Sequence, residues 1–297
     1  MKPTAYVLFS NGLDSRLALK IMQEQAKSRF KIIALYFKFP FLKDSEKEIK
    51  KFFKKTKIID CTKGKLFQEY LKIIKKPKYG YGTAINPCID CRIFILKYVR
   101  KLLKKNDFIV TGEVLGERPM SQHKRAMLLI EKTSELKGKI LRPLSARLLE
   151  ETDVEKKEII DRKKLFSIQG RGRKKQIELA KKYKIKYPSP AGGCLLCEYV
   201  FSKRLKDLFK RKKKIEPRDI ELLKIGRHFL FKEYRIIVGR NHSENLIIQK
   251  LKEKKEKIFE FKNKPGPSVL LQGKNGEKKA KELLLKYSKN KDKIIQK

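Results

Sequence analysis

The first 115 residues alternate between short apolar runs and amphipathic stretches. The apolar runs have the composition of buried strands and lie at 5–9, 31–37, 57–60 and 107–111. Between them, apolar residues recur at helical spacing at 17–26, 46–53, 66–74 and 93–103. This alternation predicts βαβ units and an α/β fold with a doubly wound parallel sheet. Ligands of such sheets bind at the carboxyl ends of the strands.

The pattern is less regular beyond residue 139 and changes again near residue 210. We predict a strand at 140–144, charged helices at 151–162 and 173–184, and a Pro/Gly-rich loop at 187–193. A basic run before Pro217 marks a boundary, which divides the chain into domains at 1–210 and 215–297. The second domain has its own signals, with strands at 234–238 and 268–271 and helices at 243–252 and in the lysine-rich end. It is expected to be a smaller α+β domain.

The segment Ser10-Asn11-Gly12-Leu13-Asp14-Ser15 joins the first predicted strand to the first predicted helix. Backbone N–H groups of such a turn, a helix N-terminus and two serine hydroxyls together form a cradle for an anion. Gly12 allows close approach of a phosphate, and Asn11 tolerates a positive φ. Asp14 would repel phosphate unless a divalent cation lay between them. The loop therefore predicts a nucleotide-phosphate site with a magnesium ligand, although the same residue types also build ordinary turns.

The charge balance indicates a polyanionic partner. The chain has 77 Lys and Arg residues against 33 Asp and Glu residues, which leaves a formal net charge of +44. Such a field favours nucleic acid and predicts binding that weakens steeply with salt, although genome bias or a hot habitat also enriches lysine. Arg171-Gly172-Arg173 is one candidate basic patch. The first apolar run is too short for a signal peptide or a membrane span, so we expect a cytoplasmic protein with reduced thiols and no membrane partner.

Four of the five cysteines form two Cys-x-x-Cys pairs, Cys88 with Cys91 and Cys194 with Cys197. In a reducing compartment this spacing favours metal binding or catalysis over disulfides. Three interpretations remain open. The pairs could close a structural zinc site, three cysteines could hold an iron–sulfur cluster with one open iron, or two could carry sulfur as a persulfide and then a disulfide.

The sequence around the cysteines sharpens two expectations. Cys91 lies beside a predicted helix N-terminus and Arg92, which would lower the pKa of its thiol. Cys194 follows Gly192-Gly193, where the backbone could approach a cluster closely. The remaining Cys61 ends a predicted strand and is expected to be a small core residue.

Several motifs together resemble one enzyme superfamily. Ser10–Ser15 resembles the SGGxDS PP-loop of the ATP pyrophosphatases, with Asn11 in place of a glycine. The stretch 86–91 (NPCIDC), with a third cysteine in a glycine-rich loop, resembles the tRNA sulfurtransferases, which include 2-thiouridylases, 2-thiocytidine synthases and 4-thiouridine synthases. Residues 111–116 (TGEVLG), followed by Ser121-Gln122, are similar to the TGE-x-LG…SQ stretch of the 4-thiouridine synthases. The likeness covers roughly residues 4–200.

The resemblance implies a PP-loop fold of the adenine nucleotide alpha hydrolase type and ATP-dependent thiolation of tRNA. ATP would adenylate a uridine or cytidine carbonyl oxygen, and sulfur would then displace AMP. The implied cofactors are ATP, Mg²⁺ and a [4Fe–4S] cluster, with Zn²⁺ as the alternative. The implied partners are tRNA and a sulfur donor, which could be a cysteine desulfurase, sulfide or a sulfur carrier protein.

The same resemblance assigns roles to individual residues. The implied catalytic residues are Asp14, Cys91 and Cys194. The implied metal ligands are Cys88, Cys91 and Cys194, with Cys197 as an optional fourth. The implied ATP-binding residues are Ser10, Asn11, Gly12, Asp14, Ser15, Phe37, Gly112 and Gln122.

The stretch 231–273, with YRIIVGRN, SENLIIQKL and PGPSVLL, resembles the RNA-binding domain of ribosome-quality-control proteins. A generic basic α+β module would show similar features. In either case Arg227, Arg235 and Arg240 are expected to contact phosphates. Two other functions stay open for the whole chain. A different PP-loop reaction, such as amide or lysine ligation onto RNA, leaves the cysteine pairs unused, and a non-enzymatic RNA-binding protein with structural zinc leaves the Ser10–Ser15 loop unused.

Overall fold

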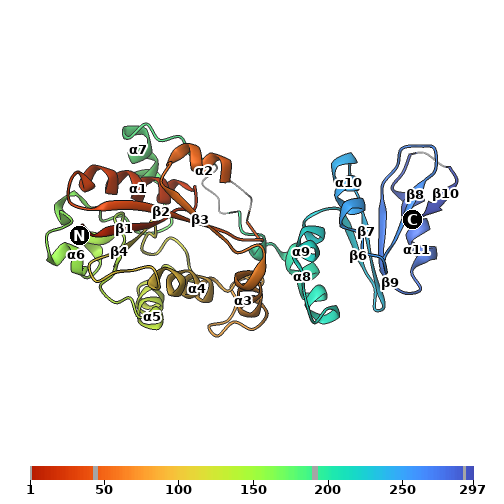
Figure 1. Ribbon diagram of the computed structural model, residues 1–297, viewed down its shortest axis with the longest axis horizontal. Coiled ribbons are helices and arrows are strands. Elements are labelled where there is room, and N and C mark those ends of the chain that lie inside the picture. Colours follow the sequence, from red (N-terminus) through yellow and green to blue (C-terminus); the bar gives the residue numbers. More distant parts are fainter. Residues whose placement is uncertain (1, 43–45, 189–192, 290–291) are drawn as a thin grey trace. The chain divides into compact units, whose positions relative to one another are not determined.

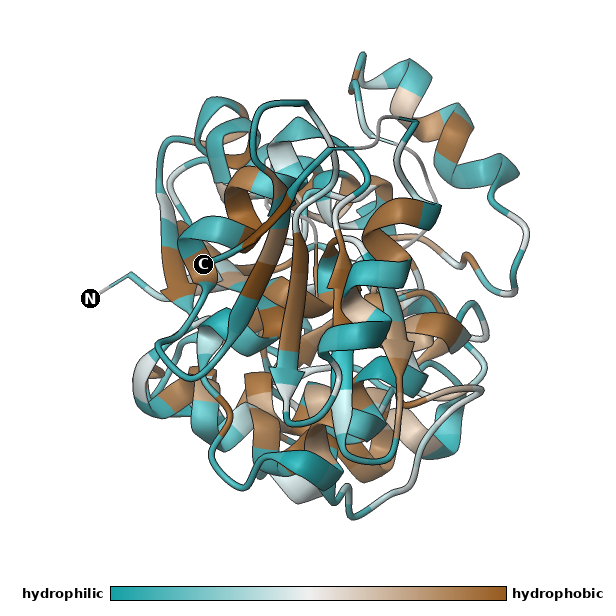
Figure 2. Ribbon diagram, turned by 90° about the vertical axis from the view of Figure 1, so that its right-hand side faces the viewer, coloured by the Kyte–Doolittle hydropathy of each residue, from teal (hydrophilic) through white to brown (hydrophobic). Residues whose placement is uncertain are grey.

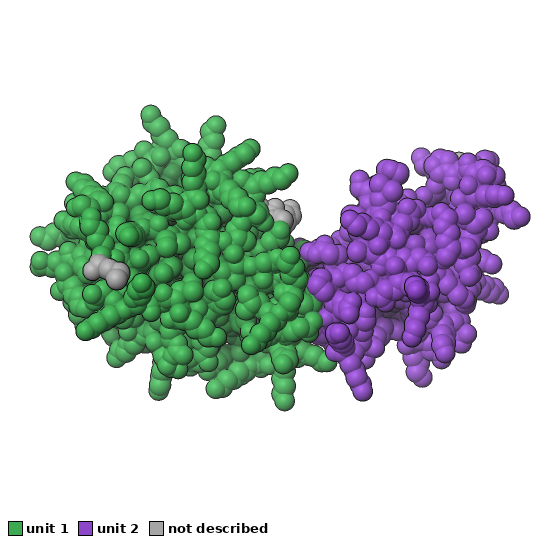
Figure 3. Space-filling model, viewed as in Figure 1, with its two compact units in different colours: residues 1–197 green, residues 198–297 purple. Residues whose placement is uncertain are grey.

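The computed structural model describes residues 2–42, 46–188, 193–289 and 292–297. The chain divides into two compact units, Met1–Cys197 and Glu198–Lys297 (Figure 3). Each unit contains one five-stranded sheet with its own apolar core. Strands are apolar along most of their length and the turns between them are hydrophilic (Figure 2). No described helix is both long and apolar enough to cross a membrane.

The first unit is built on a parallel sheet with the order β3-β2-β1-β4-β5. Its strands are β1 (Thr4–Leu8), β2 (Lys31–Lys38), β3 (Thr56–Asp60), β4 (Phe108–Thr111) and β5 (Ile140–Leu141). Helices α1 (Leu13–Ala26), α2 (Glu46–Phe52) and α7 (Lys174–Lys182) lie on one face of the sheet (Figure 1). Helices α3 (Gly64–Lys75), α4 (Cys88–Arg100) and α5 (Lys124–Ser134) lie on the other (Figure 1). The predicted doubly wound α/β fold is confirmed.

The strand order reverses between β1 and β4. After β1 the chain adds β2 and β3 on one side of it, and then adds β4 and β5 on the other side. Crevices for ligands form at such switch points, beyond the carboxyl ends of the two central strands. The segments that leave these ends are Ser10–Ser15 after β1 and the residues from Gly112 onward after β4. Sheet topology alone therefore places the two motifs next to each other.

Three predicted boundaries in this unit are wrong, each for a local reason. Helix α4 begins at Cys88 rather than at residue 93, because Pro87 accepts the first helical hydrogen bond from the Cys91 N–H. The strand expected at 140–144 is only Ile140–Leu141, and it ends just before Pro143, which has no N–H to donate. The helix expected at 151–162 is the four-residue α6 (Asp153–Lys156), since Glu158 takes a positive φ of 54°.

The second unit contains an antiparallel sheet with the order β10-β8-β9-β7-β6. Its strands are β6 (Arg227–Leu230), β7 (Tyr234–Val238), β8 (Lys257–Phe261), β9 (Val269–Gly273) and β10 (Ile294–Gln296). Its helices are α8 (Tyr199–Arg211), α9 (Pro217–Lys224), α10 (His242–Leu251) and α11 (Glu277–Lys286). The expected α+β class is confirmed, whereas β6, β8, β10, α8 and α9 carried no clear signal in the sequence.

Both faces of this second sheet are covered, and alternation along the strands explains how. Ile236 and Val238 of β7 face the cluster that includes α11, while Ile237 between them faces the cluster that includes α9 and α10. The unit begins at Glu198 rather than near residue 215, because α8 packs on α9 and β6 of the same unit. Its buried side chains include Phe201, Leu205 and Leu208.

Candidate functional site

The side chain of Asn11 forms hydrogen bonds that stabilise the turn between β1 and α1. Asn11 has a φ of 68°, so the residue that replaces the expected glycine takes the left-handed conformation. Its buried amide donates to Glu48 at 2.9 Å and accepts from Arg16 at 2.5 Å. The Arg16 Nε also donates to the Asn11 backbone oxygen at 3.0 Å. Asn11 therefore stabilises the turn with its side chain, in addition to allowing its backbone shape.

The serines of the loop bond to each other and to its backbone. The Ser15 hydroxyl donates to the Gly12 carbonyl at 2.9 Å and lies 3.3 Å from both the backbone nitrogen and the hydroxyl of Ser10. Gly12 is the N-cap of α1, and no side chain caps this helix. The first N–H groups of α1 are therefore available to an anion, as the sequence predicts for a phosphate site.

Asp14 lies in the first turn of α1 and has an unsatisfied buried oxygen. Its Oδ1 has no hydrogen-bond partner among the residues that the structure describes. Burial and the nearby Glu117 raise the pKa of Asp14 to about 6, although Arg173 and Arg118 act in the opposite direction. A carboxylate that has one buried, unpartnered oxygen and lies beside a second carboxylate is a suitable ligand for a divalent cation. The residues present therefore fit the expected Mg²⁺.

Gly112 contacts the same turn from the end of β4. A Cβ at this position would lie 2.6 Å from the backbone carbon of Asp14 and from the backbone nitrogen of Ser15. Only glycine fits there, because the atoms that it approaches are backbone and cannot move aside. Close packing against the loop explains why residue 112 is a glycine. Its contact with ATP remains a prediction.

Glu117 connects Asp14 to a segment far along the chain. The Arg173 guanidinium lies 2.5 Å from the Glu117 carboxylate, and the Arg118 Nε lies 3.9 Å from it. Arg173 precedes α7, which packs on α1. The sequence marked Arg173 only as part of a basic patch and gave no signal for Glu117 or Arg118. Their place in the site follows from the packing of α7 on α1.

Glu113 links the loop after β4 to the first turn of α4. It is buried and pairs with Arg92 at 3.1 Å and with Arg142 at 3.0 Å, and Arg142 also binds Glu131. Burial by itself would raise the pKa of Glu113, but the two guanidinium groups hold it below its ordinary value. Because Arg92 directly follows Cys91, this ion pair ties the cysteine turn to the strand end that contacts Asp14.

Two further predicted ATP-binding residues are buried in the first unit. Gln122 is 6% exposed, its Oε1 has no partner in the described part of the chain, and its backbone oxygen accepts from the Gly116 N–H at 2.7 Å. Phe37 lies in an aromatic cluster, with ring centroids 5.5 Å from Tyr98 and 6.0 Å from Phe39. Binding of ATP by these two residues stays a prediction. Gln122 has an unused hydrogen-bond acceptor, and the ring of Phe37 is packed against other rings.

Backbone hydrogen bonds bring the two Cys-x-x-Cys turns together. The Ile85 N–H, just before the first pair, donates to the Leu196 oxygen between the second pair at 3.1 Å. The Leu195 N–H donates to the Phe41 oxygen at 3.0 Å, beyond the end of β2. Segments about a hundred residues apart therefore meet at one edge of the first unit, on the side where β2 ends.

Two of the thiols have a polar side chain within hydrogen-bond distance. The Tyr70 hydroxyl lies 3.4 Å from the Cys91 Sγ, and the Asn86 amide lies 3.3 Å from the Cys88 Sγ. Burial raises the pKa of Cys91 to about 12, and a hydrogen bond with Cys197 raises that of Cys194. The expected lowering of the Cys91 pKa is wrong, because burial outweighs Arg92, whose guanidinium is engaged by Glu113.

No group of three or more His, Cys, Asp or Glu side chains is arranged as a metal site among the described residues. The cysteines still suit a soft metal, because free thiols from the two turns lie near each other. Gly192 lies outside the described residues, and a Cβ at Gly193 would meet no atom of a described residue within 4 Å. Cys61 is fully buried and is a core residue, as expected.

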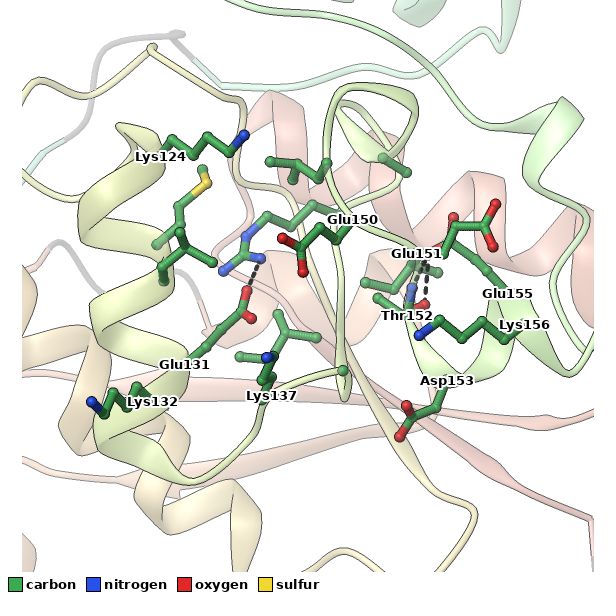
Figure 4. A pocket seen from close by; sticks show the side chains of 18 of the residues that line it. Lys124, Glu131, Lys132, Lys137, Glu150, Glu151, Thr152, Asp153, Glu155 and Lys156 are labelled. Atoms are coloured by element: carbon green, nitrogen blue, oxygen red, sulfur yellow. Dashed lines mark hydrogen bonds and ion pairs between the residues drawn. The ribbon is translucent and has the colours of Figure 1, made fainter.

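The first unit also has a cavity of about 860 Å³ at the edge of its sheet, between α5, β5 and the segment 146–156 (Figure 4). None of the predicted site residues lines it. Its carboxylates are largely paired within the protein, as Glu131 is with Arg142 and Glu155 with Arg162. The predicted site residues therefore lie outside this cavity.

The arginines that the sequence singled out in the second unit have different environments. Arg235 is 3% exposed and binds the Gln272 Oε1 at 2.9 Å, so the expectation that it contacts phosphate is wrong. Arg240 is half exposed but forms an ion pair with Glu244 at 2.5 Å. Arg227 is exposed and lies over the ring of Tyr287, 4.9 Å from the ring centroid.

Comparisons with known proteins give two findings. Residues 226–295 match the family model described as the NFACT protein RNA binding domain. Among solved structures, the chain is similar to the U34-tRNA thiolase NcsA from Methanococcus maripaludis with its [4Fe-4S] cluster, at 17% identity and a TM-score of 0.35, over 75% of this chain and 70% of that chain. No curated protein matches.

Proposed function

We propose that this protein is an ATP-dependent tRNA sulfurtransferase. One observation carries the proposal. The Asp14 turn and the Cys88–Cys91 turn are coupled through consecutive residues of one strand end, since Gly112 contacts the backbone of Asp14 and Glu113 pairs with Arg92. A site for nucleotide activation and a site rich in thiols are therefore built on one framework.

The loop of the first unit would bind the polyphosphate of ATP. N–H groups at the start of α1 and the Ser10 and Ser15 hydroxyls would contact the phosphates. Asp14 would hold Mg²⁺, which would supply positive charge to the departing pyrophosphate. Adenylation would convert a pyrimidine carbonyl oxygen, a poor leaving group, into a good one.

The thiol-rich site would deliver sulfur to the activated carbon. Cys88, Cys91 and Cys194 would hold a [4Fe–4S] cluster, which would supply an open iron position for sulfur. Sulfur bonds to the carbon as AMP leaves with the former carbonyl oxygen. The alternatives for the same thiols are a zinc site or a persulfide, and thiolation by protein without bound iron would favour them.

The match of residues 226–295 to an RNA-binding domain and the net charge of +44 support an RNA substrate. The first unit would perform the reaction and the second would hold the RNA. We expect the RNA to be tRNA, which combines a modifiable pyrimidine with a folded polyanion.

The test is an anaerobic assay with purified protein, ATP, a sulfur source and unmodified tRNA. We expect AMP, pyrophosphate and a thionucleoside, the last identified by mass spectrometry, together with bound iron. ATP consumption without a thionucleoside would favour a different PP-loop ligation. Bound zinc without ATP consumption would favour a non-enzymatic RNA-binding protein, and either result would overturn the proposal.

A further inference from the structure

The second unit has a cavity of about 590 Å³ at one end of its antiparallel sheet. The start of β6, the end of β8, the turn from β7 to α10, the loop before β9 and the end of α11 all line it. We propose that this cavity binds an unpaired nucleotide of the RNA substrate. The proposal rests on the RNA substrate of the proposed function, but it does not depend on the sulfur chemistry.

Free positive charge surrounds the cavity. Three of its lining side chains, Arg227, Lys264 and Lys289, have no carboxylate partner among the described residues. Its one lining carboxylate, Glu260, is already neutralised by Lys297 at 2.6 Å and accepts from the Ser268 hydroxyl at 2.5 Å. The cavity therefore favours an anion such as phosphate, and among the described lining residues no unpaired carboxylate is left to repel it.

One wall offers a surface on which a base can stack. The Arg227 guanidinium lies over the Tyr287 ring, 4.9 Å from its centroid, and Phe229 supports that ring from a centroid distance of 5.8 Å. Guanidinium planes and aromatic rings are the platforms on which proteins stack unpaired bases of RNA. The cavity thus combines a phosphate-binding rim with a stacking surface.

The walls are fixed before any ligand binds. The Asn245 amide donates to the Gly266 oxygen and accepts from the Ser268 N–H, both at 3.0 Å. A Cβ at Gly239 would lie 2.1 Å from the Asn245 Oδ1, and one at Gly266 would lie 2.6 Å from the Phe261 ring. A site whose shape is preformed loses less entropy when it binds a ligand.

The N-terminus of α10 is not the recognition element, because the Asn241 side chain caps it by accepting from the Glu244 N–H at 3.0 Å. Side chains around the cavity must therefore bind the ligand. The volume is within the range of about 300–1,000 Å³ for small-ligand sites. A base can enter only if it leaves its stack, so the cavity should select single-stranded over double-stranded RNA.

Binding of fluorescently labelled RNA to the full-length protein tests the proposal. The probes are a ten-nucleotide single strand and a ten-base-pair duplex, each titrated over a range of KCl concentrations. The cavity variant is Lys264→Ala/Lys289→Ala. The matched control is Lys254→Ala/Lys255→Ala, which removes the same charge from exposed residues before β8, at the opposite end of that strand. A third variant, Arg227→Lys, keeps the charge but loses the planar group.

We expect the cavity variant to bind the single strand about tenfold more weakly. Its salt slope should fall by about 1.4, because each lost phosphate contact removes about 0.7 for single strands. The control should change affinity less than threefold, with no change in slope. Arg227→Lys should weaken binding of the single strand about fivefold at an unchanged slope and leave the duplex unaffected. Equal thermal midpoints would show that all three variants are folded.

Three results would overturn the proposal. Equal losses in the cavity and control variants would mean that the whole basic surface binds RNA without a specific site. Equal losses for the single strand and the duplex would exclude an unpaired base. Displacement of the RNA by micromolar uridine monophosphate would assign the cavity to a free nucleotide. A protein without thiolation activity but with the expected binding pattern would contradict the proposed reaction and leave this proposal intact.

Discussion

The two units use charge in opposite ways around their candidate sites. In the first unit, the buried Arg142 is matched by the buried Glu113, and among the described residues the Asp14 carboxylate has an oxygen without a partner. In the second unit, carboxylates are neutralised and the unmatched groups are exposed cations such as Arg227. Buried and paired charge fixes the geometry of a reaction site, whereas exposed and unpaired charge attracts a polyanion. This contrast agrees with the proposed function, in which the first unit performs the reaction and the second binds RNA.

The largest expected effect is on the unmatched acid of the first unit. We expect Asp14→Ala to lower the release of AMP and pyrophosphate at least a thousandfold, because the leaving pyrophosphate would lose its cation. Affinity for tRNA should change less than twofold, since the second unit is untouched. Glu24→Gln, at the far end of α1, is the control and should retain full activity. Wild-type turnover of ATP by Asp14→Ala with tRNA would show that the loop assignment is wrong.

The cysteine turns should matter for sulfur transfer and much less for RNA binding. Cys91→Ser and Cys194→Ser should each lower thiolation at least a hundredfold and reduce bound iron after anaerobic reconstitution. Cys197→Ser should retain iron and activity, because this side chain is exposed and a three-cysteine cluster does not need it. Full iron and activity in Cys194→Ser would contradict the ligand assignment. Tight zinc binding by all four thiols, with thiolation independent of iron, would contradict the cluster.

In the absence of nucleotide and Mg²⁺, the ionised carboxylate of Asp14 should also lower the free energy of unfolding of the first unit. Its pKa is about 6 when folded against an ordinary value of 3.8, so the native state binds the proton more tightly than the unfolded state. The free energy of unfolding should therefore fall as pH rises from about 4 through 6, by at most about 3 kcal/mol. Urea denaturation at pH 4.5 and pH 7 measures this change.

The variant Asp14→Asn isolates the contribution of that carboxylate. It should be more stable than the wild type at pH 7 by about 1–3 kcal/mol and should lose most of the decline between pH 4 and 6. Mg²⁺ with a nonhydrolysable ATP analogue should stabilise the wild type and not the variant. A variant that is less stable at pH 7 would mean that Asp14 has a structural partner.

The smallest expected effect concerns the contribution of the second unit to tRNA binding. We expect a protein that ends at Cys197 to bind tRNA at least tenfold more weakly than the full chain, about 1.4 kcal/mol, with a shallower salt dependence. The truncation is placed at Cys197 because a chain that ended at residue 214 would keep α8 without α9 and β6, on which its buried face packs. Unchanged affinity in the shortened protein would move the RNA site onto the first unit.

Several features of the site could be predicted because they depend on local backbone physics. The β1 turn tolerates Asn11 since asparagine adopts a positive φ at low cost. The alternation of apolar runs and helical stretches led to the correct sheet class. The Arg235 expectation failed because a strand in the middle of a sheet can bury even an arginine when Gln272 binds it from the neighbouring strand.

By itself, the sequence determined the strands of the parallel sheet, the position of the turn proposed to bind phosphate, and the pairing of four cysteines by their spacing. These properties depend on residues close together in the chain. Only the tertiary structure decided that Glu117 and Arg173 act on Asp14, that Glu113 joins the cysteine turn to the loop, and that burial raises the Cys91 pKa. Such effects depend on distance in space and on the exclusion of water, which the sheet order and helix packing set and which spacing along the chain does not encode.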